Sequence, residues 1–189
     1  MTLLVAGLLS LPAVATWANW AADTGTGGVY RANNEHHWFA YGPTAGPDIV
    51  NAFEAARTQD FEPTTLITSN HGTGIGDNDL WDVYVQKCYG CPEDEDAVAY
   101  AKCENTFYRS STGEVLCSHW HVWVNGVYTD DYNAWWMRVV GCHETGHTVG
   151  LTHQSSGDSN FYACMMADTN LITRNDLGNH NTFHINNYY

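Results

Sequence analysis

Apolar residues recur at a helical spacing in one segment of the first third of the chain. Between residues 47 and 57 they fall on a single helix face, and Pro47 and Asp48 are residue types that suit a first helical turn. We therefore expect an amphipathic helix from Pro47 to about Arg57. Its apolar face consists of Ile49, Val50, Phe53 and Ala56.

Two shorter segments are rich in β-forming residues and are bounded by turn residues. They cover residues 64–69 and 80–86, and both predict strands. The glycine-rich segment 71–76 lies between them. Because it is not followed by a lysine and a helix, we do not expect it to bind a phosphate group.

The strongest two-residue alternation lies between residues 114 and 128 and predicts a strand. Asn125-Gly126 follows the alternating residues, and this dipeptide is typical of a tight β-hairpin turn. His119 and His121 share one face of this strand, where we expect them to be partly exposed polar residues rather than metal ligands.

Two further helices are predicted in the second half of the chain. Asp130 or Asp131 can cap a helix from about Tyr132 to Val149, which carries apolar residues along one side. A short C-terminal helix is expected near residues 180–186. We find no internal repeat and no long linker, which favours a single domain.

The first residues of the chain have the pattern of a signal peptide. An apolar run extends over residues 3–11 and ends in Ala13-Val14-Ala15, which has the small-x-small form of a signal-peptidase site. The run is too short to span a bilayer. We therefore expect residues 1–15 to be removed and residues 16–189 to form one secreted domain.

Six cysteines are consistent with export, since an even number behind a signal-like segment indicates disulfides rather than cytosolic thiols. The Cys88-x-x-Cys91 spacing could instead be half of a zinc site or a redox motif, but the chain has no second pair of that spacing. Disulfides are therefore the preferred interpretation. The candidates are Cys88, Cys91, Cys103, Cys117, Cys142 and Cys164.

The chain is strongly acidic, with 7 Lys plus Arg against 21 Asp plus Glu and a formal charge of -14. Such a surface repels nucleic acid and anionic membranes, so we expect neither as a partner. The acidic run 93–96 is best explained as a solvated loop. Asp77-Asn78-Asp79 offers oxygen donors for Ca²⁺, but its spacing matches no EF-hand and the support for a calcium site is weak.

Three histidines and one glutamate form the most informative motif of the chain. On a helix, His143 and His147 lie one turn apart on one face, and Glu144 projects beside them. Gly150 can adopt a positive φ, so the chain can turn back and bring His153 to the same point. Three nitrogen ligands leave a fourth position for water, which is typical of a catalytic Zn²⁺ site.

The spacing His-Glu-x-x-His-x-x-Gly-x-x-His, followed by the methionines of residues 162–166, resembles the metzincin clan of zinc metallopeptidases. The similarity is firm over residues 134–166, and the chain is also similar to small secreted bacterial metalloproteases. Gln154 follows the third histidine, where astacins have Glu and reprolysins have Asp, so the family within the clan stays unassigned. The resemblance implies a methionine beneath the histidines, Met166 by its Cys-x-Met spacing or else Met165.

The resemblance also implies a fold. It predicts an α+β domain of α/β/α type with a small, mostly parallel twisted sheet, an antiparallel edge strand, a long active-site helix and a C-terminal subdomain after the third histidine. The edge strand, which would bind the substrate main chain, is expected within residues 115–124. A disulfide between Cys142 and Cys164 is expected because the clan brings these two segments together, which leaves the other four cysteines to form two bridges.

These observations lead to the expectation of a secreted zinc endopeptidase. One Zn²⁺ held by His143, His147 and His153 would activate a water molecule, and Glu144 would act as the general base. Two alternatives remain open. One is a secreted zinc-binding surface or assembly protein without catalytic turnover, and the other is a zinc hydrolase of a non-peptide amide.

Overall fold

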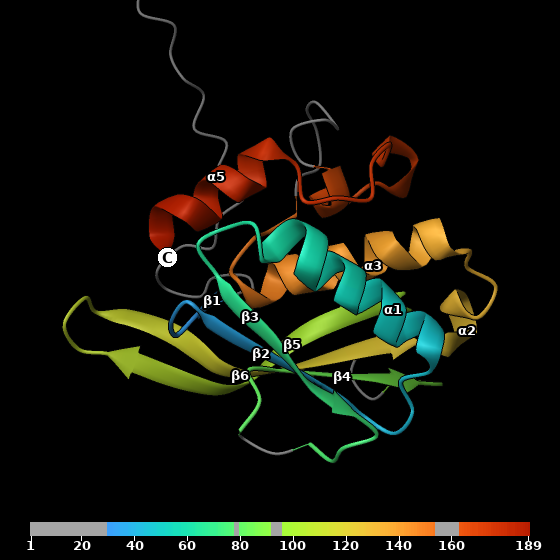
Figure 1. Ribbon diagram of the computed structural model, residues 1–189, viewed down its shortest axis with the longest axis horizontal. Coiled ribbons are helices and arrows are strands. Elements are labelled where there is room, and N and C mark those ends of the chain that lie inside the picture. The colour runs from blue at the N-terminus through green and yellow to red at the C-terminus, as the bar shows by residue number, and fades with distance from the viewer. Residues whose placement is uncertain (1–29, 78–79, 92–95, 154–162) are drawn as a thin grey trace, which may run out of the picture.

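The computed structural model describes residues 30–77, 80–91, 96–153 and 163–189. The proposed signal segment, Gln154 and residues 93–95 of the acidic run lie outside these described residues. Figure 1 shows a twisted sheet with helices gathered on one of its faces.

The sheet has six strands, and five of them run parallel to one another. The exception is β5, which runs antiparallel to β6. This arrangement confirms the predicted mixed fold with a mostly parallel sheet. In chain order the strands are β1 (Arg31–Ala32), β2 (His36–Tyr41), β3 (Ile67–Thr73), β4 (Val83–Cys88), β5 (Ala99–Arg109) and β6 (Glu114–Asn125).

The edge strand was placed incorrectly by the sequence analysis. Residues 115–124 belong to β6, which lies inside the sheet, because Val122 is paired with Val85 of β4 on one side and with Ala101 of β5 on the other. Among the described strands, β5 is the outermost strand on this side of the sheet. The alternation that predicted a strand is correct, but alternation does not show how many neighbours a strand has.

The predicted hairpin at Asn125-Gly126 is also wrong. Asn125 is fully buried, and its side chain accepts a hydrogen bond from the Val127 amide, which caps the short helix α2 (Gly126–Thr129). The β-hairpin lies before β6 instead, in the turn 110–113 between β5 and β6. Gly113 supplies the left-handed conformation of this turn, with φ of 78°.

The helices follow the predicted hydrophobic pattern. Helix α1 (Pro47–Ala56) continues as one π-helical turn, Arg57–Phe61. Helix α3 (Ala134–Thr148) is capped by the side chain of Asn133, which accepts from two backbone amides, rather than by Asp130 or Asp131. Helix α5 (Asn179–Tyr188) is longer than expected, and 3-10 turns cover Ala163–Met165 and Thr169–Leu171.

The helices form two layers above the sheet. In Figure 1, α1 and α3 lie over the sheet and α5 lies on the far side of them. The core between the first layer and the sheet includes Phe39, Val122 and Phe53. A second core connects α3 to the C-terminal segment through Leu151, Met165 and Ile185. Helix α3 is therefore buried from two sides, which fixes its position.

Three disulfides connect the six cysteines, as predicted. The expected bridge between Cys142 and Cys164 is present and joins α3 to the following 3-10 turn. The other two bridges are Cys88–Cys91 and Cys103–Cys117. The Cys103–Cys117 bridge joins β5 to β6, so it holds the outer strand to the sheet. None of the described helices is long and apolar enough to cross a membrane.

Candidate metal centre

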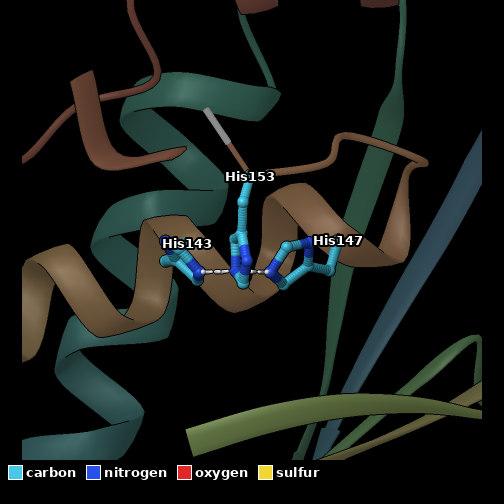
Figure 2. A group of neighbouring side chains, drawn as sticks. All are labelled: His143, His147 and His153. Carbon is cyan, nitrogen blue, oxygen red and sulfur yellow. Dashed lines mark hydrogen bonds between the residues drawn. The ribbon is translucent and has the colours of Figure 1, made fainter. Parts of the chain in front are cut away.

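The three histidines of the motif meet at one point. His143 and His147 extend from adjacent turns of α3, and the chain then turns back at Gly150, whose φ is 96°. This turn brings His153 between the other two rings, as Figure 2 shows. Within the described ranges, this is the one group of three or more His, Cys, Asp or Glu side chains whose ligand atoms all lie within 4.8 Å of one another.

Backbone carbonyl groups orient two of the rings. His143 Nδ1 lies 2.6 Å from the carbonyl oxygen of Cys164, and His147 Nδ1 lies 2.8 Å from that of Leu151. A carbonyl oxygen only accepts hydrogen bonds, so both Nδ1 atoms carry the proton. In the neutral rings, the two Nε2 atoms are therefore left with lone pairs directed into the centre.

The distances at the centre fit a bound cation. The Nε2 atom of His153 lies 2.9 Å from that of His143 and 3.0 Å from that of His147, and the latter two are 3.1 Å apart. Two lone pairs at 3.1 Å repel unless a positive charge lies between them. Tetrahedral Zn–N bonds would separate these nitrogens by about 3.3 Å, so the observed triad matches a zinc ion with only a small expansion.

The surroundings favour the neutral form of these rings. Burial, together with the charge of His153, lowers the pKa of His143 to about 4. Burial and both neighbouring histidines lower the pKa of His147 well below its usual value, and burial lowers that of the more exposed His153. Neutral imidazole is the form that binds metal ions.

Glu144 lies next to the triad on α3 and is buried. Burial raises the pKa of its carboxyl group to about 8, and a hydrogen bond to the backbone of Ala101 in β5 partly opposes this shift. Its Oε2 atom is buried and has no hydrogen-bond partner. A buried carboxyl oxygen without a partner is costly, and such groups are concentrated at functional sites.

The triad and Glu144 face a cavity of about 660 Å³. Its walls include residues 97–101 at the beginning of β5 and just before it, the face of α3 that carries His143 and His147, and the segment 166–172. Apolar side chains cover much of the surface around the histidines. They are Tyr132, Trp136, Val139, Val140, Met166 and Ile172.

Both candidate methionines contact the region around the motif helix. Met166 lines the cavity together with the three histidines, and it packs with Val139. Met165 points into the second core, where its sulfur occupies the space that a Cβ on Gly146 would need. Of the two methionines, Met166 therefore faces the cavity and Met165 faces the second core.

His119 and His121 are not part of this centre. They are buried rather than partly exposed, which corrects the sequence-based expectation. His119 Nε2 lies 2.9 Å from Asp77 Oδ1, and His121 Nδ1 lies 3.4 Å from Oδ2 of the same carboxylate. Asp77, one of the weak calcium candidates, is thus engaged with two imidazoles, while Asn78 and Asp79 lie outside the described residues.

Sequence reasoning missed the part of the site that β5 contributes. Residues 97–101 (Ala-Val-Ala-Tyr-Ala) line the cavity, and the backbone of Ala101 contacts Glu144. The short alternation of small and larger apolar residues was the available signal, but most of β5 beyond residue 101 is polar. A comparison of the sequence with models of known protein families and with curated proteins finds no match.

Proposed function

We propose that the protein is an extracellular zinc-dependent endopeptidase related to the metzincins. The single observation that carries this proposal is the convergence of three Nε2 atoms beside a buried carboxyl group in an open apolar cavity. A purely structural zinc site has four protein ligands and needs no acid or base, whereas this site offers three ligands and Glu144. The three disulfides fit an oxidising, extracellular environment.

His143, His147 and His153 would hold the zinc ion. When bound, zinc would supply a Lewis acid that polarises a carbonyl group and acidifies water. The carbonyl groups of Cys164 and Leu151 keep two of the rings in the tautomer that binds metal. The polypeptide therefore fixes ligand geometry before any ion arrives.

Glu144 would move the proton in the reaction. Peptide hydrolysis forms a bond between the water oxygen and the scissile carbonyl carbon, and it breaks the C–N bond. Glu144 would accept the proton that the water loses and deliver it to the leaving nitrogen.

The start of β5 would position the substrate. This strand is the outermost described strand on its side of the sheet, and its first residues form one wall of the cavity. An extended peptide lying along β5 would make main-chain contacts of the kind that add a strand to a sheet. Such contacts bind many sequences, so selectivity would come from the apolar part of the cavity.

The test compares two variants of the mature protein with the wild type. Glu144→Ala should retain about one zinc ion per chain but lose hydrolysis of unfolded protein substrates by several orders of magnitude, because Glu144 is a base and not a ligand. His153→Ala should lose the zinc ion that is bound at this centre. Zinc content and cleavage are measured on the same samples.

Three outcomes would oppose the proposal. Undiminished cleavage by Glu144→Ala would place the activity at another site or in a contaminant. A wild-type protein that holds zinc and cleaves neither peptides nor other amides would favour a non-catalytic zinc-binding protein, and cleavage of non-peptide amides alone would favour the other hydrolase class.

A further inference from the structure

A second pair of histidines lies outside the candidate metal centre, on α5. His180 and His184 are four residues apart, and their Nε2 atoms are 3.1 Å from each other. The two ring centroids are 4.5 Å apart and the ring planes meet at 85°. Neither residue lines the cavity that holds Glu144.

This geometry repeats that of the first two histidines of the triad. His143 and His147 are also four residues apart on a helix, with Nε2 atoms 3.1 Å apart, centroids 4.7 Å apart and planes at 88°. Side chains at this spacing can adopt many other rotamers, which would carry the rings apart. In both pairs the Nε2 atoms instead lie within hydrogen-bonding distance of each other, which is close enough for one ion to contact both.

The composition of α5 gives the helix little intrinsic stability, so a cross-link between its turns would stabilise it. Its ten residues, Asn-His-Asn-Thr-Phe-His-Ile-Asn-Asn-Tyr, include no charged side chain, so no ion pair can form between its turns. Asn, Thr and His all have low helix propensity, and no side chain caps the helix at Gly178. The intrinsic stability of this helix is therefore low.

We propose that His180 and His184 form a second metal site, which binds a transition-metal ion such as Zn²⁺ and cross-links adjacent turns of α5. Two imidazoles from the protein fill two positions of a tetrahedral shell, and other ligands such as water complete it. With two protein ligands among the described residues, against three at the triad, this site binds zinc more weakly and fills after it. It is a stabilising site that is independent of the proposed peptidase activity.

Metal binding at α5 would stabilise the rest of the domain as well, because α5 packs against the second core. Ile185, next to His184, is fully buried in the core that also contains the Cys142–Cys164 bridge. An ion that binds the folded helix but not the unfolded chain raises the free energy of unfolding by mass action. Zinc added beyond the first equivalent should therefore raise the melting temperature.

The experiment titrates Zn²⁺ into the chelator-treated mature protein and measures bound zinc by equilibrium dialysis. The wild type should bind a second, weaker equivalent, and His180→Gln/His184→Gln should bind only the first. His153→Ala should lose the stronger equivalent and keep the weaker one. His36→Gln is the matched control, because His36 is an exposed histidine on β2 and its removal should leave both equivalents unchanged.

The double variant could fail to fold, so a second measurement uses the wild type alone and follows its histidine resonances during the zinc titration. The side-chain Nε2 resonances of His180 and His184 should shift as the second equivalent binds, while those of the triad respond to the first. The proposal is overturned if the wild type binds one equivalent only, if the double variant still binds two, or if the Nε2 resonances of His180 and His184 do not respond.

Discussion

Gly141 of α3 lies against the backbone of Ala52 in α1, and a Cβ added at position 141 would lie 2.8 Å from the Ala52 carbonyl oxygen. This close approach holds α3, and with it the histidine motif that begins two residues later, against α1. Because the obstructing atom belongs to the backbone, a side chain at position 141 could be accommodated only by moving a helix.

The first prediction follows from this contact. Gly141→Ala should lower the free energy of unfolding by about 1–3 kcal/mol, the usual cost of overpacking a core, although alanine is the better helix former. Chemical denaturation measures the change. Gly76→Ala is the control, because nothing lies within 4 Å of a Cβ at position 76, and it should change stability by less than about 0.5 kcal/mol. Equal losses in both variants would contradict the packing argument.

The second prediction concerns the disulfides. Removing the Cys142–Cys164 bridge with a double alanine variant should cost about 3 kcal/mol, because the bridge closes a loop with a sequence separation of 22. Removing Cys88–Cys91, with a separation of 3, should cost about half as much. The measurement is the denaturant concentration at the midpoint of unfolding, compared between variants whose unfolding free energy has the same dependence on denaturant. A larger loss from the short bridge would show that loop closure is not the main effect.

The third prediction concerns pH. His37 on β2 is buried, and its Nε2 lies 2.8 Å from Thr148 Oγ1, whose own hydroxyl donates to the Thr145 carbonyl oxygen. The ring therefore donates through Nε2, and its buried Nδ1, which has no hydrogen-bond partner, favours the neutral form. Burial lowers its pKa from 6.5 to about 4. Between these two values the unfolded chain binds a proton that the folded chain does not, so stability is full above pH 6.5 and falls as the pH drops toward 4.

The measurement is the free energy of unfolding at pH 7 and at pH 4 for the wild type and His37→Gln. The wild type should lose up to about 3 kcal/mol more than the variant over this range, as expected for a pKa lowered by this amount. The exposed residue His36 supplies the control, and His36→Gln should retain the wild-type pH dependence. Identical pH dependence in the wild type and His37→Gln would show that His37 is not responsible.

The fourth prediction tests the apolar part of the cavity and rests on the proposed function. Val139 lines the cavity one helical turn before His143. Val139→Phe should reduce kcat/KM for peptides with a large apolar side chain at the cleavage site by about 10–100-fold, and it should affect peptides with alanine there much less. Val127→Phe, on the exposed surface of α2, is the matched control and should leave this preference unchanged. An unchanged preference in Val139→Phe would show that this wall does not select the substrate.

Local patterns were sufficient for the parts of the molecule in which neighbouring residues determine the outcome. The helical spacing of apolar residues predicted α1 and α3, and the motif spacing predicted the convergence of His143, His147 and His153. The left-handed conformation of Gly150 was predicted for the same reason. Each of these features depends on residues within about three turns of a helix.

Features that depend on distant partners were missed. Strand β2 (His36–Tyr41) is nearly continuous in aromatic and apolar residues, because it lies between β3 and β4 and has no regular polar face. Strand β5 is largely polar beyond residue 101 and is held by its pairing with β6 and by the Cys103–Cys117 bridge. His119 is buried because Asp77, far away in the sequence, reaches it.

Under the proposed function, the hydrogen bond between His143 Nδ1 and the Cys164 carbonyl would give oxidation and zinc loading a fixed order. Cys164 is itself half of the bridge to Cys142, the residue that precedes His143, so oxidation of this pair constrains the carbonyl that orients the His143 ring. A newly made chain in a reducing compartment lacks this constraint and should have a lower affinity for zinc. Under the proposed function, oxidation would then come before metal loading, and a chain still in a reducing compartment would have less peptidase activity than the oxidised protein.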